Sequence, residues 1–234
     1  LPSVPGSIAD PLSTHAVNVT GTLNLLMAAQ RAGVERFVFS SSCAVYGDSP
    51  ALPKDETMIP APKSPYAASK LAGEHYCHTF AEAFGLDAVS LRYFNVFGPR
   101  QDPRSQYAAV IPNFITAMIR GQSPTIYGDG RQSRDFVYVA NVVQANLLAA
   151  NTAEIGGRVL NIATGQRHTL LDLVDALNDL LGTHISPVYE PARRGDVRHS
   201  LADITAAGGT LGYRPRVGFR EGLRRTAAWY RERL

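Results

Sequence analysis

One short run constrains the fold of this chain more than any other segment. Residues 37–42 read Phe-Val-Phe-Ser-Ser-Ser, so that large apolar side chains give way to small hydroxyls. Such a run predicts a strand buried in a parallel sheet, and we place that strand at residues 36–41. In open α/β sheets, ligands bind beyond the carboxyl ends of the strands. The serines therefore indicate a ligand site where this strand ends.

The rest of the chain alternates between helical and extended patterns. We predict helices at residues 12–33, 65–84, 110–120, 140–150, 169–181 and 219–232, and further strands at residues 87–93, 124–127, 135–139, 158–163 and 185–189. Long loops are expected at residues 43–63 and 96–107. Strands that alternate with helices are typical of an α/β protein with a parallel sheet.

Tyr66 and Lys70 lie four residues apart at the start of the helix predicted at residues 65–84. Residues at positions i and i+4 share one face of a helix, so the phenol and the ammonium would point the same way. A nearby cation favours the ionised phenol and lowers its pKa from about 10, which lets a tyrosine take a proton from an alcohol. The spacing also arises by chance as a solvated pair, so by itself it leaves catalysis a hypothesis.

Several short motifs follow one another in an order typical of a known family. They are Ser3-Val4-Pro5, Asn18-Val19-Thr20-Gly21-Thr22, Ser40 to Gly47, Tyr66 to Lys70, Arg92 to Arg100, Tyr107 to Pro112, Ser133-Arg134-Asp135 and Arg193-Arg194-Gly195-Asp196. With these motifs the chain resembles, over nearly its whole length, the extended short-chain dehydrogenase/reductases of the NAD-dependent epimerase/dehydratase family. Within that family it is most similar to the 4-epimerases of UDP-glucose and UDP-N-acetylglucosamine.

The resemblance implies a Rossmann-like doubly wound parallel sheet with a smaller α+β domain that binds substrate. Residues 1–95, to which residues 135–165 return, would form the C-terminal part of an NAD-binding domain. Residues 96–134 and 166–234 would bind the nucleotide sugar. The sequence holds no glycine-rich turn after a first strand, the feature that binds the cofactor pyrophosphate. We therefore expect about the first third of the usual protein to be missing.

The same resemblance implies a reaction, the 4-epimerisation of a UDP-hexose through transient oxidation at C4 by NAD. Tyr66 would take the proton of the 4-hydroxyl group, Lys70 would lower the Tyr66 pKa and hold the cofactor ribose, and Ser42 would hydrogen-bond the same hydroxyl. The cofactor-binding residues that it implies are Asn18, Ser40, Tyr66, Lys70 and Tyr93. The protein would supply position and electrostatics, and NAD the redox chemistry.

The second half of the chain resembles the part of the family that binds the UDP-sugar. The residues that this implies are Asn95 at the diphosphate, Ala109 and Val110 along the uridine, Thr125 and Tyr127 around the base, Arg134 and Arg193 at the two phosphates, Asp196 at the ribose and Ser200 in the sugar pocket. A guanidinium suits the phosphates because it binds oxyanions through a planar fork. Outside its motif, Arg193 would be equally compatible with a solvated surface charge.

Two positions narrow the reaction and the substrate. Related dehydratases carry an acidic pair directly after the active-site hydroxyl, and decarboxylating relatives keep a glutamate there, whereas this chain has Cys43-Ala44. Simple epimerisation is therefore favoured. Ser200 aligns with a tyrosine that narrows the pocket in epimerases restricted to plain hexoses. A serine leaves room for a 2-acetamido group, so we predict that UDP-GlcNAc and UDP-GalNAc are substrates besides UDP-glucose and UDP-galactose.

Other functions stay open at this point. A UDP-glucuronate 4-epimerase would need a cation that faces C6 of the sugar, and the sequence assigns none. Another nucleotide-sugar enzyme of the superfamily, a non-catalytic nucleotide-binding regulatory protein and an inactive fragment are further alternatives.

Composition narrows the partners and the location. The chain has 234 residues, 45% of them hydrophobic and 18% charged, and a net charge of +3 without a basic block, which argues against nucleic-acid binding. No apolar run approaches the ~18 residues of a membrane span. Cys43 and Cys77 offer no disulfide framework, so we expect a cytoplasmic protein. No group of residues has metal-ligand spacing. By resemblance, the helices at residues 12–33 and 65–84 would form a homodimer interface.

Overall fold

The computed structural model describes residues 1–102, 110–192 and 197–234. Its helices are α1 (Val4–Ala9), α2 (Pro11–His15), α3 (Gly21–Arg31), α4 (Pro65–Phe84), α5 (Val110–Ile119), α6 (Val139–Asn151), α7 (Leu170–Leu181), α8 (Thr205–Leu211) and α9 (Phe219–Arg231), with a π-helical turn η1 (Ala16–Thr20) and a 3-10 turn η2 (Cys43–Tyr46). Its strands are β1 (Phe37–Ser42), β2 (Ala88–Tyr93), β3 (Asn95–Phe97), β4 (Thr125–Tyr127), β5 (Ser133–Arg134), β6 (Phe136–Tyr138), β7 (Val159–Ile162), β8 (His168–Thr169) and β9 (Val188–Glu190).

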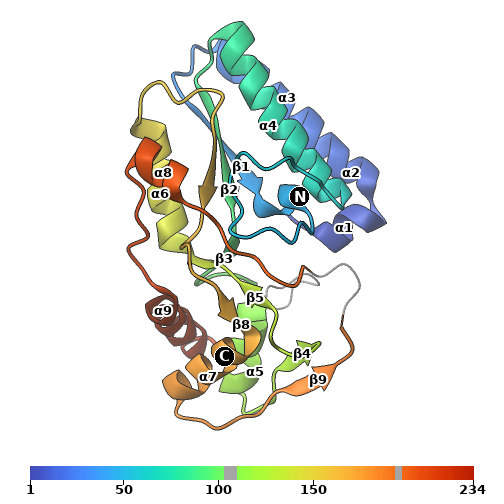
Figure 1. Ribbon diagram of the computed structural model, residues 1–234, viewed down its shortest axis with the longest axis vertical. Coiled ribbons are helices and arrows are strands. Elements are labelled where there is room, and N and C mark those ends of the chain that lie inside the picture. The colour runs from blue at the N-terminus through green and yellow to red at the C-terminus, as the bar shows by residue number, and fades with distance from the viewer. Residues whose placement is uncertain (103–109, 193–196) are drawn as a thin grey trace.

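The central sheet has the order β1-β2-β7, and its strands run parallel. Ser42 at the end of β1 pairs with Tyr93 at the end of β2, so both strands finish at one edge. Figure 1 shows α3 and α4 on one side of this sheet and α6 and α8 on the other. The predicted α/β class with a parallel sheet is therefore confirmed.

Alternation along β2 explains why both faces of the sheet are covered. Val89 and Leu91 are buried in a cluster with side chains of α6 and α8. Ala88, one residue out of step, is buried in a cluster with Phe39 and the apolar side of α4. Successive side chains of a strand point to opposite faces, so a continuous apolar run needs helices on both sides.

Local signals at both ends define α4. The Ser64 hydroxyl accepts a hydrogen bond from the Ala67 N–H at 3.1 Å, and Pro65 occupies the first turn. The helix ends at Gly85, which adopts the left-handed conformation with φ 67°. Inside the helix, Gly73 lies directly against Phe39, because a Cβ atom at Gly73 would stand only 2.3 Å from the ring. This glycine lets α4 approach β1 closely.

A buried ion pair also joins α4 to the sheet. The Arg92 guanidinium on β2 donates two hydrogen bonds to the Glu74 carboxylate, at 2.9 and 2.7 Å, and both side chains are 4% exposed. The Ser41 hydroxyl donates to the same carboxylate. The guanidinium also stacks on the Tyr46 ring, 4.6 Å from its centroid. Bidentate contacts of this kind fix geometry as well as contributing energy.

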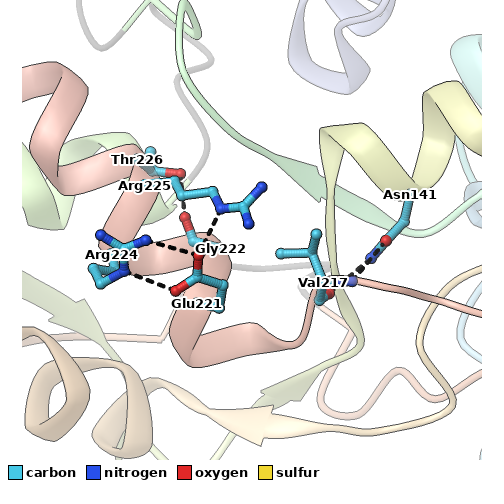
Figure 2. Close-up of polar contacts among 7 residues, drawn as sticks. All are labelled: Asn141, Val217, Glu221, Gly222, Arg224, Arg225 and Thr226. Atoms are coloured by element: carbon cyan, nitrogen blue, oxygen red, sulfur yellow. Dashed lines mark hydrogen bonds and ion pairs between the residues drawn. The ribbon is translucent and has the colours of Figure 1, made fainter.

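The second half of the chain has an apolar core of its own, formed by α5, α7 and α9 around Phe97 and Phe136. Figure 2 shows how the segment before α9 is held: Asn141 of α6 donates to the Val217 carbonyl oxygen at 2.8 Å and accepts from the Val217 N–H at 3.0 Å. The division into two domains at the predicted boundaries stays a prediction.

The short elements escaped the sequence analysis. They are α1, α8, β3, β5 and β8, together with the π-helical turn η1. Two of the three residues of β3 fall in the predicted loop at 96–107, and β3 forms a strand because it pairs with β6 some forty residues later. A periodic pattern needs several repeats to be recognised, and each of these elements is only seven residues long or shorter. None of the described helices combines the length and apolarity that a membrane crossing requires.

Candidate active site

The three predicted catalytic residues lie at the carboxyl edge of β1. Ser42 ends the strand in an extended conformation, and its hydroxyl accepts from the Ala44 N–H at 3.2 Å. Tyr66 is the second residue of α4. Lys70 follows one turn later, with its ammonium 5.9 Å from the centroid of the Tyr66 ring. The structure therefore brings the phenol, the ammonium and the strand-end hydroxyl to one place.

Burial governs the electrostatics of Tyr66 and Lys70 in the protein by itself. Burial raises the pKa of the Tyr66 phenol above its usual value, and hydrogen bonding by Ser42 only partly opposes this rise. Burial also lowers the pKa of Lys70, whose ammonium donates to the Ser40 carbonyl oxygen at 2.9 Å. The lowering of the Tyr66 pKa by Lys70 stays a prediction, because the direction of the shift in the protein by itself is set by burial of the phenol.

Ser40 and Tyr93, two of the predicted cofactor-side residues, meet at the same edge. Their hydroxyl groups lie 3.2 Å apart, and the Tyr93 hydroxyl donates to the Asn146 side chain at 2.8 Å. Ser40 is exposed, so its hydroxyl can reach a ligand. Asn146 was missed by the sequence analysis because a single polar residue within a helix carries no distinctive pattern.

Asn18 lies in the π-helical turn η1, a feature that is frequent at functional sites. Its side chain is 6% exposed, and its amide donates to the Ser69 hydroxyl at 3.0 Å. Ser69 in turn donates to the Tyr66 carbonyl oxygen at 2.7 Å. Asn18 is thus hydrogen-bonded to α4 through Ser69, which in turn holds the backbone of Tyr66.

Two adjoining cavities lie in this part of the molecule, and the second of them lies beside the group. The first, here the α5 cavity, has a volume of about 670 Å³ and lies between α5, β4 and β6. Five predicted substrate residues line it, namely Asn95, Val110, Thr125, Tyr127 and Arg134. The predicted residues Ala109, Arg193 and Asp196 lie outside the described residues.

The second cavity, here the η2 cavity, has a volume of about 560 Å³. Cys43 and Ala67, which directly follow Ser42 and Tyr66, line it together with Ser200. Asn95 and Arg134 line both cavities, so the two spaces adjoin. A ligand with one end in each cavity would pass these two side chains.

Backbone carbonyl groups position Arg134 at this junction. Its guanidinium donates to the carbonyl oxygens of Ser133 at 3.0 Å and Arg198 at 3.2 Å. The next residue, Asp135, is fully buried and accepts from the backbone N–H groups of Thr164 and Gly165 at 2.8 and 2.9 Å. The sequence analysis gave Asp135 no role. The signal that could have found it is an acidic residue directly before the apolar run Phe136-Val137-Tyr138, where a carboxylate is buried only if it accepts hydrogen bonds.

Lys54 is a third residue that the sequence analysis missed, after Asn146 and Asp135. It lines the η2 cavity, and it is only 3% exposed. In the sequence, Lys54 stands in a loop rich in proline and charge, where a lysine is ordinarily solvated, so its position gave no sign of its burial.

Over residues 1–102, 110–192 and 197–234, no group of histidine, cysteine or acidic side chains could hold a metal ion.

Comparison with known proteins gives a consistent result. The NAD dependent epimerase/dehydratase family model matches residues 1–163. A UDP-glucose 4-epimerase of Mycolicibacterium smegmatis (strain ATCC 700084 / mc(2)155) is 40% identical over 232 residues, which are 99% of this chain and 74% of that protein.

Two solved structures are also close. One is a UDP-N-acetylglucosamine 4-epimerase from Methanobrevibacter ruminantium M1 in complex with UDP-N-acetylmuramic acid, with a TM-score of 0.96 and 45% identity, covering 100% of this chain and 75% of that one. The other is MoeE5 in complex with UDP-glucuronic acid and NAD, with a TM-score of 0.92 and 39% identity, covering 100% of this chain and 77% of that one.

Proposed function

The chain belongs to the NAD dependent epimerase/dehydratase family, and from this premise we propose that it catalyses the 4-epimerisation of a UDP-hexose. The family resemblance drawn from the sequence motifs is confirmed, and so are the Rossmann-like fold and NAD as the cofactor. The observation that carries the proposal is the meeting of Ser42, Tyr66 and Lys70 beside a cavity that adjoins a second, larger one.

The polar groups at the edge of β1 fit the ribose end of NAD. The Lys70 ammonium is a donor, and the hydroxyls of Ser40 and Tyr93 can each donate or accept, which suits a pair of neighbouring ribose hydroxyls. When bound, NAD supplies a positively charged ring that takes a hydride from C4 of the sugar and returns it. Asn18 supports this site through Ser69 rather than by reaching into it.

The chain's own contribution is the movement of one proton. Tyr66 takes the proton from the oxygen at C4, and Ser42 hydrogen-bonds that oxygen and orients it. A phenol with a pKa at or above about 10 is ionised in fewer than about one molecule in a thousand at pH 7. Burial of Tyr66 lowers the ionised fraction of the phenol further, so positive charge beside the phenol is needed to make it a base. Lys70 lies close enough to provide part of that charge.

The adjoining cavities suit the two ends of a UDP-sugar. The uridine would occupy the α5 cavity between Val110, Thr125 and Tyr127, with Ala109 and Asp196 as further contacts. The diphosphate would pass Asn95 and Arg134 at the junction, assisted by Arg193. The sugar would enter the η2 cavity.

Two side chains of the η2 cavity set the reaction and the breadth of substrates. Ser200 is small and lines the cavity, which supports acceptance of a 2-acetamido group. Burial raises the pKa of the Cys43 thiol to about 11, so it stays neutral at pH 7. A neutral thiol replaces the acidic pair of a dehydratase, which supports simple epimerisation.

We also propose a homodimer through the helices at residues 12–33 and 65–84. Apolar side chains of the first helical segment are exposed, with Leu12 at 82%, Val17 at 52% and Leu25 at 62%. Monomeric proteins rarely expose several large apolar side chains close together without a partner, so these side chains support an interface.

Two free cysteines support a reducing, cytoplasmic location. Nucleic acid is not among the proposed partners.

The test is direct turnover by the purified protein supplied with NAD. UDP-glucose and UDP-GlcNAc are incubated separately, and proton NMR follows the appearance of the C4 epimers. Tyr66→Phe removes the base and should lower kcat by about 10²- to 10⁴-fold. Tyr189→Phe, at a tyrosine of β9 that is 53% exposed, is the matched control. A folded protein that binds UDP-glucose without interconverting it would instead support the non-catalytic binding protein.

A further inference from the structure

Lys54 is a buried cation in the wall of the η2 cavity, and the proposed epimerisation does not use it. We propose that Lys54 binds a carboxylate on the sugar, so that the substrates include anionic UDP-sugars. This inference rests on the proposed function, because it concerns the sugar end of the same site.

Backbone contacts hold Lys54 firmly beside Ser200. Its N–H donates to the Leu201 carbonyl oxygen at 2.8 Å, and its own carbonyl oxygen accepts from the Asp203 N–H at 2.8 Å. The same carbonyl oxygen accepts from the Asn161 side chain at 3.0 Å. Lys54 is therefore a built part of the cavity wall rather than a mobile surface side chain.

In the described part of the chain the Lys54 ammonium forms no direct ion pair, although the charge of Asp48, which also lines the η2 cavity, acts on it. It donates to the Ser49 carbonyl oxygen, which can satisfy one of its three N–H groups. The other lysine of this loop, Lys63, is exposed and pairs with Asp48 at 3.3 Å. Buried charges in proteins are ordinarily paired, so an ammonium in a cavity wall whose one hydrogen bond among the described residues goes to a carbonyl oxygen is suited to an anionic ligand.

The acidic side chains near Lys54 in sequence are engaged elsewhere. Asp55 accepts from the Thr57 N–H at 2.8 Å. Glu56 accepts from the Asn161 N–H at 2.6 Å and is half-buried on that side. Burial lowers the pKa of Lys54, and the charge of Asp48 partly offsets the effect. A ligand carboxylate would supply the negative charge that stabilises the Lys54 ammonium.

Two kinds of sugar carry a carboxylate close to C4. A hexuronate carries it as C6, and a muramate carries it on a lactyl ether at C3. The UDP-glucuronate alternative needed a cation that the sequence could not assign, and Lys54 meets that need. The two structural relatives described above hold one ligand of each kind, UDP-glucuronic acid and UDP-N-acetylmuramic acid.

The experiment compares three substrates with three variants. Epimerisation of UDP-glucose, UDP-glucuronate and UDP-N-acetylmuramate is followed by NMR for the wild type, Lys54→Met, Lys54→Arg and Arg231→Met. In Lys54→Met, kcat/KM for an anionic sugar relative to UDP-glucose should fall by about 10- to 100-fold, which is the range of a lost charge-assisted hydrogen bond. Lys54→Arg keeps the charge and should retain most of the preference. Arg231→Met removes an exposed cation at the end of α9, away from the η2 cavity, and should leave the ratio within about threefold of the wild type.

The outcomes separate the two sources and the two proposals. A loss confined to UDP-glucuronate identifies a C6 carboxylate, and a loss confined to UDP-N-acetylmuramate identifies the lactyl group. Equal losses for all three substrates would show a structural lysine and overturn the inference. So would a wild type that turns over UDP-glucose and binds neither anionic sugar. Absence of UDP-glucose turnover by the wild type would count against the proposed function instead.

Thermal unfolding distinguishes recognition from folding. A methionine of similar length replaces a buried charge that has no ion-pair partner among the residues that the structure describes, so Lys54→Met should match or exceed the wild-type Tm. A clear drop in Tm together with loss of the UDP-glucose activity would contradict the assignment of Lys54 to ligand binding.

Discussion

At the scale of single residues, the reactivity of Tyr66 depends on how its burial is compensated. Desolvation favours the neutral phenol, whereas catalysis needs the phenolate. The deprotonated base gains population as pH rises. We therefore expect kcat/KM to increase with pH up to the apparent pKa of Tyr66 in the enzyme with NAD bound, and to fall in acid.

Lys70→Met tests the source of that compensation. Loss of the ammonium removes positive charge beside the phenol, so the rising limb of the pH profile should move to higher pH, and the rate at pH 7 should fall. The measurement is kcat/KM for UDP-glucose between pH 5.5 and 10. An unshifted limb with a lower plateau would mean that Lys70 only positions the ribose.

The same scale shows which residues sequence reasoning can reach. Tyr66 and Lys70 stand on a helix with local signals at both ends, so their common direction follows from spacing alone. Lys54 could not be found this way, because its burial depends on pairing with residues 201–203 far along the chain. Asn146 is similar, since it becomes part of the site only through the Tyr93 hydroxyl.

At the scale of elements, the position of α4 depends on a close approach to β1. Gly73→Ala would place a methyl group against Phe39 and should destabilise the protein by about 1–3 kcal/mol. Gly209→Ala in α8 has no neighbour within 4 Å and should be neutral or should stabilise by up to about 1 kcal/mol. Urea unfolding measures both, and equal effects in the two variants would contradict the packing argument.

Long elements could be predicted because their signals are local. The bounds of α4 agree with the sequence prediction, and the Ser64 cap, Pro65 and Gly85 all lie within it or beside it. By contrast, β5 consists of two residues that are extended because they pair with β8. A pattern of two residues does not distinguish a strand from a loop. The sequence therefore could not predict β5, which carries Arg134 at the junction of the two cavities.

At the scale of the whole molecule, the exposed apolar side chains of α2 and α3 predict assembly. Replacing Leu12 and Leu25 together by glutamate should convert a dimer to a monomer at micromolar concentration. Ile59→Glu, at a side chain that is 91% exposed in a loop, should leave the mass unchanged. Light scattering measures the mass, and a monomeric wild type would contradict the proposed interface.

The buried pair of Glu74 and Arg92 has a consequence for how the reactive end of α4 can fail. Sliding the helix along the sheet would separate two ions in a place that water does not reach, which is more costly than any small gain from repacking. Positions of α4 between the native one and full detachment from the sheet are therefore unfavourable. We infer that destabilising changes elsewhere in the protein do not shift the Tyr66 phenol gradually. Each molecule either keeps α4, and with it Tyr66, in the native position, or loses α4 from the sheet altogether.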